Sequence, residues 1–417
     1  MTKDLIKYLI SYYQDFVSQI AFEERQYQLE PCANYVFVGL RRAGKSYLMY
    51  QQIHHLMEEG HSVEEILYFN FEDDRIDSLE LADLDAIKLS YEEMYDHRPI
   101  FFLDEIQNVK GWEKFARRLA DTGYQVYITG SNAKMLSSEI ATTLGGRYLV
   151  KEIYPFSFRE FLTFKQINLS NKNALYKYRN AIVKAYEAYF RDGGLPETLK
   201  MNDKRSWISS LFNKIFFGDL VARHQVRNDF ALRIMIRKLA ESVKQPSSYN
   251  RIANIASTVG KKISVDTVID YMSYLQESWL ILPFENIATK LIEKESNRKY
   301  YFIDNGILNL FLVDPVTSLL ENQVAIRLRQ RYGERVYFYN QNVEVDFVVY
   351  DERVAFQVAY SIADPDTEKR EVDALLKLNK VMLMCQLTII TKEEEREIKV
   401  GDLTIRVVPV WKWMLEE

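Results

Sequence analysis

Short apolar runs alternate with segments of helical spacing along the first third of the chain. Four such runs predict buried strands, at residues 35–38, 66–71, 99–103 and 124–132. Residues 47–53 instead show apolar positions at helical spacing. Buried strands separated by helices are typical of a parallel sheet covered on both faces. The pattern therefore predicts an α/β domain over residues 1–160.

The pattern changes twice beyond residue 160. Residues 161–225 have helical spacing, and residues 226–290 show two helices, a turn, a third helix and a strand. From residue 291 to 417, strand and helix patterns mix again. We therefore expect four parts: an α/β core, a helical lid segment, a small helical domain with a strand, and a second α/β domain.

Composition narrows the class of protein. The 417 residues include 54 Lys and Arg and 59 Asp and Glu, a net charge of −5, so the chain is not a uniformly basic nucleic-acid binder. Cys32 and Cys385 lie far apart without metal-ligand spacing, which favours reduced thiols. No apolar run is long enough to span a bilayer, and the first residues do not form a signal peptide. A soluble cytoplasmic protein without a membrane partner is expected.

The clearest motif lies between the first predicted strand and the first predicted helix. Residues 39–46 read Gly-Leu-Arg-Arg-Ala-Gly-Lys-Ser, a full G-x-x-x-x-G-K-[ST] phosphate-binding loop, or P-loop. Its glycines let successive amides point at one place, at the start of a helix that attracts anions. The sequence therefore predicts ATP binding by Gly39, Arg41, Arg42, Ala43, Gly44, Lys45, Ser46 and Tyr47.

Two adjacent acids end the strand predicted at residues 99–103. Asp104 and Glu105 should lie at the carboxyl edge of a parallel sheet, where ligands of such sheets bind. Asp104 and the Ser46 hydroxyl would hold Mg²⁺, and Glu105 would draw a proton from the attacking water. The alternative is a strand that simply ends in two solvated acids.

Polar groups also end the strand predicted at residues 124–132. Ser131 and Asn132 are placed to contact the γ-phosphate or the attacking water. A helix predicted from residue 133 to 142 then leads to Arg147, which follows two glycines. By spacing alone, Arg147 is either a solvated charge or a catalytic group.

The order of these motifs resembles that of the AAA+ ATPases. It is most similar to the archaeal and bacterial branch that ends in a restriction-nuclease-like domain. Further stretches that carry the resemblance lie at residues 154–161, 193–197, 219–223, 301–306 and 344–347. The resemblance implies that Ser131 or Asn132 is the sensor residue. It also implies that Arg147 reaches into the site of a neighbouring subunit, so that catalysis needs a homo-oligomer.

Residues 226–290 have the layout of a winged helix. Helices are expected at residues 249–256 and 264–275, followed by a strand at 279–282 that would begin the wing. The second helix carries Asp266 and Asp270 and has no arginine to read a guanine edge. DNA binding and a plain packing or protein-contact role therefore both remain open.

The C-terminal part should have the restriction-endonuclease-like fold without its activity. In this resemblance Glu321 and Asp346 take the metal-binding positions. Gln357 stands where a further acid belongs, and Ala359 replaces the lysine that would steer water. Because an amide binds a hard cation poorly and alanine carries no charge, nuclease activity is not expected.

Together these features predict a Mg²⁺-dependent ATPase that couples its nucleotide state to movement or assembly of its C-terminal domains. The alternatives are a slow nucleotide-gated switch, a DNA-associated scaffold and, as the weakest, an ATP-regulated nuclease. The implied cofactors are ATP and Mg²⁺. The implied partners are further copies of this chain, with DNA through the C-terminal domains or an unidentified protein as further candidates.

Overall fold

A computed structural model describes residues 1–76, 79–131, 142–169, 173–259, 263–288 and 297–416. The chain divides into two compact units, each described by itself below. The first unit comprises Met1–Tyr154 with Glu277–Trp279, and the second comprises Pro155–Gln276 with Leu280–Glu417. Asn132 and most of the helix expected at 133–142 lie outside the described residues.

The first unit is built on a parallel sheet in the order β2-β3-β4-β1-β5. The strands are β1 (Asn34–Val38), β2 (Ile66–Asn70), β3 (Ile100–Asp104), β4 (Val126–Gly130) and β5 (Tyr148–Glu152). Strands β1 to β4 are almost wholly buried, as their apolar runs predicted. The parallel α/β core is therefore confirmed. The sequence analysis missed the edge strand β5, because its apolar run is only Tyr148-Leu149-Val150 before Lys151 and Glu152; Leu149 and Val150 are exposed.

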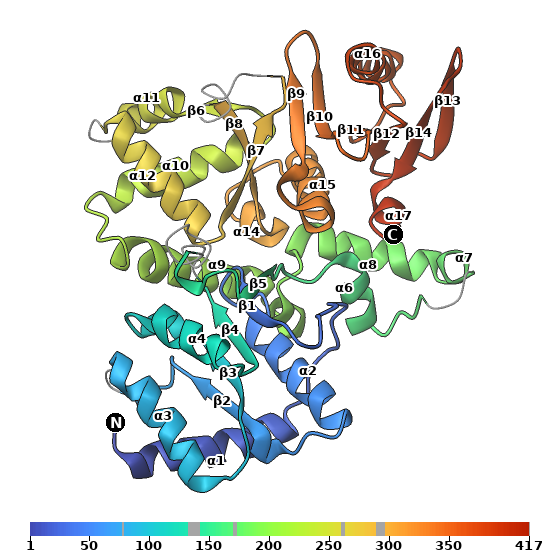
Figure 1. Cartoon of the computed structure of the whole chain (residues 1–417). Helices are drawn as coiled ribbons and strands as arrows, with labels where there is room; N and C mark the ends of the chain where they lie inside the picture. Colours follow the sequence, from blue (N-terminus) through green and yellow to red (C-terminus); the bar gives the residue numbers. More distant parts are fainter. Residues whose placement is uncertain (77–78, 132–141, 170–172, 260–262, 289–296, 417) are drawn as a thin grey trace. The chain divides into compact units, whose positions relative to one another are not determined.

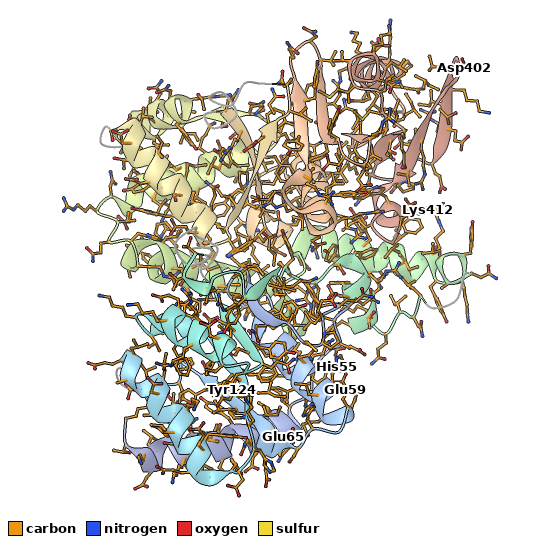
Figure 2. The ribbon with its side chains drawn as sticks, in the orientation of Figure 1. His55, Glu59, Glu65, Tyr124, Asp402 and Lys412 are labelled. Atoms are coloured by element: carbon orange, nitrogen blue, oxygen red, sulfur yellow. The ribbon has the colours of Figure 1, made fainter. Side chains whose placement is uncertain are left out.

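Helices surround this sheet in the blue and cyan part of the chain (Figure 1). They are α1 (Lys3–Gln19), α2 (Lys45–Glu58), α3 (Leu81–Met94) and α4 (Trp112–Asp121). Helix α1 buries its apolar face against β2 and α3. Helix α2 begins at the P-loop, and Figure 2 labels His55 and Glu59 at its other end.

The second unit opens with helices, as the helical spacing of residues 161–225 predicted. They are α6 (Phe158–Phe164), α7 (Ala174–Lys177), α8 (Arg179–Asp192), α9 (Lys204–Lys214) and a π-helical segment, η5 (Ile215–Ala222). Helices α10 (Asp229–Glu241), α11 (Tyr249–Val259) and α12 (Val265–Glu277) follow. The helices expected at 249–256 and 264–275 are confirmed within a few residues.

The described strands of the second unit form one sheet in the order β13-β14-β12-β11-β10-β9-β7-β8-β6. From the β6 end they are β6 (Ser247–Ser248), β8 (Asn297–Phe302), β7 (Ile281–Asn286), β9 (Tyr337–Asn340), β10 (Glu344–Val349), β11 (Val354–Val358), β12 (Gln386–Thr391), β14 (Leu403–Pro409) and β13 (Arg396–Val400). Strand β7 begins two residues later than expected, since Trp279 has a φ of 60° and cannot extend the strand.

Further helices lie along this sheet. They are α14 (Asn305–Asn309), α15 (Val316–Tyr332), α16 (Pro365–Val381) and α17 (Val410–Trp413). Leu375 and Leu378 of α16 pack into a core shared with Val345, Ile389 and Val407 of the sheet. In Figure 1 helices α14 to α17 are coloured orange to red. In the described residues, no helix is both long and apolar enough to cross a membrane.

Three stretches that carry the family resemblance meet inside the second unit. The Asp304 carboxylate accepts hydrogen bonds from the backbone N–H groups of Gly194 (2.7 Å) and Gly306 (2.8 Å). A Cβ atom at Gly193 would lie 2.1 Å from Asp304, and one at Gly194 would lie 2.2 Å from the Phe156 carbonyl oxygen. The glycines therefore allow three distant segments to approach closely.

Candidate nucleotide-binding site

The P-loop curls tightly between β1 and α2. Gly44 precedes α2 with a φ of 99°, and Gly39 leaves β1 with a φ of 150°. A Cβ atom at Gly39 would lie 2.1 Å from the carbonyl oxygen of Ile153, so only glycine fits there. The loop delivers the unpaired amides of the first turn of α2 to one place, an arrangement that suits phosphate.

Lys45 lies inside this loop and is 4 % exposed. Its ammonium donates hydrogen bonds to the carbonyl oxygens of Gly39 and Leu40, both at 3.1 Å. The same ammonium lies 3.6 Å from Oε1 of Glu105. The positive charge that the sequence assigned to the phosphates is therefore held between the P-loop and the end of β3.

Asp104 ends β3 as a buried acid that is 2 % exposed. Its carboxylate accepts hydrogen bonds from the hydroxyls of Thr129 and, at 2.6 Å, Tyr68. Burial raises the pKa of Asp104 and the negative charge of Glu105 raises it further, while hydrogen bonds, including one with Ser46, oppose this rise. The two predicted magnesium ligands, Ser46 and Asp104, are thus brought into contact.

Glu105 follows with a φ of 54°, an uncommon conformation for a residue other than glycine. Its backbone N–H donates to Thr129 Oγ1 at 2.9 Å, and its Oε2 accepts from the Ser131 backbone N–H at 3.2 Å. Burial opposes ionisation of Glu105, but the Lys45 ammonium and the Gln107 amide favour it. The net result is a pKa below the ordinary value. Glu105 is therefore an ionised carboxylate at neutral pH, as a general base must be.

Two arginines connect this loop to other segments. Arg41 donates to both carboxylate oxygens of Glu72, at 3.0 and 3.4 Å. Arg25 is buried and donates to the carbonyl oxygens of Ala43 (3.0 Å) and Tyr154 (2.9 Å). Arg25 thus holds the P-loop backbone in place from a segment in which sequence reasoning found no signal.

The remaining predicted nucleotide contacts differ in their surroundings. Arg42 adopts a φ of 62° within the P-loop. Tyr47 is 44 % exposed and lies edge-on against Tyr50, with ring centroids 5.4 Å apart. Ser131 lies next to Glu105, whereas Asn132 is outside the described residues.

Arg147 lies at the opposite edge of the sheet. It precedes β5, whose first residue, Tyr148, pairs with Asn34 at the start of β1. The Arg147 side chain forms an ion pair with Asp121 at the end of α4. Since β1 spans about 17 Å at about 3.3 Å per residue, Arg147 does not join Lys45 in the same subunit. A role in a neighbouring subunit stays a prediction.

The donor set fits Mg²⁺ in the presence of a nucleotide. In the described residues, no group of three or more His, Cys, Asp or Glu side chains is arranged to hold a metal ion. Mg²⁺, however, is commonly bound by one or two carboxylates together with substrate phosphates and water. Ser46 and Asp104 provide such a partial set beside the P-loop.

Tyr68 was missed as a site residue because its strand was recognised only by its apolar pattern. Its hydroxyl lies between Asp104 and the hydroxyl of Tyr50, 3.1 Å away. Sequence reasoning also missed Thr129 as a hydrogen-bond donor to Asp104. A polar side chain near the carboxyl end of a buried strand is the signal that sequence reasoning had available for both residues.

Comparison with known families agrees with this geometry. A family model described as "AAA domain" matches residues 33–162, and one described as "Domain of unknown function (DUF8612)" matches residues 183–317. The first match covers β1 to β5 and the whole P-loop. The fold and this match identify residues 33–162 as a P-loop domain of the AAA type, a family whose members are nucleotide-binding ATPases.

The chain belongs to the family of an uncharacterized protein of Methanocaldococcus jannaschii, to which it is 34% identical over 91% of this chain and 88% of that protein. An uncharacterized protein of Haemophilus influenzae is 30% identical over 91% of this chain and 94% of its own length. Among solved structures, a Walker-type ATPase of Pyrococcus abyssi is similar, with a TM-score of 0.39 and 14% identity. That similarity covers 66% of this chain and 90% of the other.

Proposed function

We propose that this chain binds ATP with Mg²⁺ at the carboxyl edge of the parallel sheet and hydrolyses it. The observation that carries the proposal is the meeting of Lys45 and Ser46, at the start of α2, with Asp104 and Glu105, at the end of β3. This arrangement supports a site in which the loop binds phosphate, Ser46 and Asp104 hold magnesium, and Glu105 acts as the base.

Each residue has a separate role in this mechanism. The Lys45 ammonium neutralises the terminal phosphates, and the α2 amides hold them in place. Ser46 and Asp104 would hold Mg²⁺, and the bound ion would neutralise charge on the phosphates. Glu105 accepts a proton from water, and its hydrogen bond from the Ser131 N–H fixes the orientation of the carboxylate.

The test separates binding from chemistry. Glu105→Gln keeps the size of the side chain but cannot accept the proton, so ATP affinity should persist while turnover falls by about 10²-fold or more. Glu113→Gln, on α4, is the matched control and should leave turnover unchanged. Wild-type turnover in the Glu105→Gln protein would place the base elsewhere.

We also propose that hydrolysis acts in an assembly, with Arg147 serving the site of a neighbouring copy. Its position at the far edge of the sheet supports a role outside its own subunit. Arg147→Ala should abolish turnover with little loss of ATP affinity. Mixing it with the Glu105→Gln protein should restore part of the turnover, because some sites would then combine an intact base with an intact arginine. Co-assembled subunits that give no rescue would exclude this role.

Coupling of nucleotide state to the C-terminal domains belongs to the same proposal. The chain order α10-β6-α11-α12-β7 supports a winged helix at residues 226–290, and β8, which pairs with both β6 and β7, extends it beyond residue 290. Turnover measured with and without duplex DNA tests whether DNA is its partner. Stimulation by DNA would favour a DNA-coupled ATPase, and unchanged turnover would favour a protein partner or a slow switch.

The strands and helices from α15 to β12 support a restriction-endonuclease-like fold for residues 291–417, as proposed from the sequence. Gln357 and Ala359 occupy β11 and the position just after it, in place of an acid and a lysine. We expect no cleavage of DNA with Mg²⁺ or Mn²⁺. Cleavage by the pure protein that Asp346→Ala abolishes would overturn this expectation.

A further inference from the structure

A lysine lies at the centre of the carboxylates that the nuclease resemblance assigns to a metal ion. Lys299, on β8, has none of its surface exposed. Its ammonium lies 3.0 Å from Glu344 Oε1, 3.3 Å from Glu321 Oε1 and 3.4 Å from Asp346 Oδ1. Glu321 comes from α15, whereas the other two acids come from β10. One cation therefore joins three structural elements.

The number of donors matches the number of acids. A lysine ammonium has three N–H donors and no acceptor, and here three separate carboxylates surround it. The ring of Phe338 lies behind it, with its centroid 5.6 Å from Nζ. The ammonium is thus paired on one side and packed against an aromatic face on the other, which compensates for its complete burial.

The spacing of the oxygens suits an ammonium and not a metal ion. Mg²⁺ and Ca²⁺ bind oxygens at about 2.0–2.6 Å, whereas these oxygens lie 3.0 to 3.4 Å from Nζ. Lys299 also stands where the ion would have to be. Glu321 and Asp346 therefore do not fit a resident divalent cation while Lys299 remains between them.

Other bonds fix the acids in this arrangement. The Tyr301 hydroxyl donates to Glu321 Oε1 at 2.7 Å, and the Val358 N–H donates to Asp346 Oδ2 at 2.9 Å. Gln357 accepts from the backbone N–H of Asp346 at 2.8 Å. Burial raises the pKa of Glu321 to about 7 in spite of Lys299, since Asp346 lies nearby. Hydrogen bonds therefore hold the acids in place. The cluster contains more acidic groups than the single positive charge of Lys299 can neutralise.

We propose that the Lys299 ammonium is the resident cation of this carboxylate cluster and takes the place of a divalent metal ion. The cluster then holds α15 and β10 against β8 without any metal. A cavity of 820 Å³ is lined in part by Glu321, Glu344 and Asp346, so it reaches all three acids of the cluster. Removal of the ammonium should therefore convert the cluster into a site that a divalent ion can enter.

The experiment measures Mn²⁺ binding to the full chain without nucleotide, at pH 8, where protons compete less with the metal ion for the acids. Lys299→Met keeps an unbranched side chain of similar length and removes the charge. This variant should bind one more Mn²⁺ ion than the wild type. Its melting temperature should rise as Mn²⁺ is added. The matched control is the double variant Lys299→Met with Asp346→Asn, which should lose the new Mn²⁺ site. Mn²⁺ bound at Asp104 would be the same in both proteins, so the control distinguishes the two sites.

Two results would overturn the proposal. One is Mn²⁺ binding by the wild type that the single substitution Asp346→Asn abolishes, because the cluster would then hold a metal ion even with Lys299 present. The other is a folded Lys299→Met protein that gains no site. If Lys299→Met alone does not fold, either Mn²⁺ during refolding or the added pair Glu321→Gln and Asp346→Asn should restore folding. Failure of both would likewise overturn the proposal, which does not depend on ATP hydrolysis.

Discussion

The hydroxyl of Tyr68 donates a 2.6 Å hydrogen bond to Oδ2 of Asp104, inside the sheet and next to the P-loop. Both residues are buried and lie on neighbouring parallel strands: Asp104 ends β3, and Tyr68 lies two residues before Asn70, the last residue of β2, which pairs with Asp104. A tyrosine in a strand otherwise recognised by its apolar residues therefore orients the carboxylate assigned to Mg²⁺. Substitution of Tyr68 therefore measures how much the orientation of the Asp104 carboxylate matters for the use of Mg²⁺.

Tyr68→Phe should raise the Mg²⁺ concentration needed for half-maximal turnover, with little change in nucleotide affinity. A hydrogen bond to a charged group contributes about 1.5–3 kcal/mol, so an increase of about tenfold or more is expected. The measurement is turnover as a function of Mg²⁺ at saturating ATP. Tyr50→Phe is the control, because it removes a hydroxyl 3.1 Å from Tyr68 and leaves the bond to Asp104 in place. Equal effects of the two variants would argue against a positioning role for Tyr68.

Lys45→Ala should weaken ATP binding by about 10²-fold or more, because the ammonium that faces the phosphates is removed. Binding of a fluorescent ATP analogue measures the change. Lys88→Ala removes a surface lysine that pairs with Glu92 on α3 and should leave affinity unaltered. Unchanged affinity in a folded Lys45→Ala protein would show that the P-loop is not the site.

Turnover should be insensitive to pH over a wide acid range. Lys45 and the hydrogen bonds at Glu105 hold its pKa below the ordinary glutamate value, so the base stays ionised as pH falls. At saturating Mg²⁺, which would keep Asp104 ionised, we expect a level profile of kcat from about pH 8 to about pH 5, with loss of activity as Glu105 becomes protonated below that range. An acid limb near neutral pH that does not move as Mg²⁺ is increased would indicate a different base, because a limb due to protonation of Asp104 would move to lower pH.

Gly39→Ala should destabilise the first unit more than Gly60→Ala. Both glycines have positive φ, at 150° and 108°, so both substitutions strain the backbone by about 1–2 kcal/mol. Only at Gly39 would the new Cβ also meet backbone, 2.1 Å from the Ile153 oxygen, whereas Gly60 has open space around it. Thermal unfolding of both variants gives the comparison. Equal shifts would mean that Ile153 moves aside freely.

Gln357→Glu should destabilise the second unit at neutral pH by about 1–3 kcal/mol. The Gln357 amide donates to Glu371 Oε2 at 2.8 Å and to the Glu344 carbonyl oxygen at 3.1 Å, and a carboxylate would repel both. Repulsion raises the pKa of the new carboxyl in the folded state, so the loss is full at high pH and declines as pH falls through that value.

Unfolding of the Gln357→Glu protein at pH 8 and pH 5 measures this dependence. Adding Glu371→Gln reverses the donor and the acceptor and should recover part of the stability. A loss that is the same at both pH values would exclude charge repulsion as its cause.

The sequence by itself determined the parallel core and the principal site residues. Strands buried on both faces carry a continuous apolar run, and the P-loop needs glycine at fixed positions, so both leave a local signal. Strand β3 ends at Asp104, and Glu105 follows it as predicted, because charged residues are disfavoured within the buried strand and accepted at its edge. The edge strand β5 left a weaker signal, since it is not buried on both faces and its short apolar run ends in Lys151 and Glu152.

Only the tertiary structure decided which distant side chains meet. The contacts of Tyr68 with Asp104 and of Arg25 with Ala43 join residues 36 and 18 positions apart. Lys299 lies 22 positions from Glu321 and 47 from Asp346. Nothing near Lys299 in the sequence marks it as buried, because the cost of burying its charge is met by acids that other elements bring to it. The order of strands and the packing of α15 decide that pairing, and neither is encoded in a local pattern.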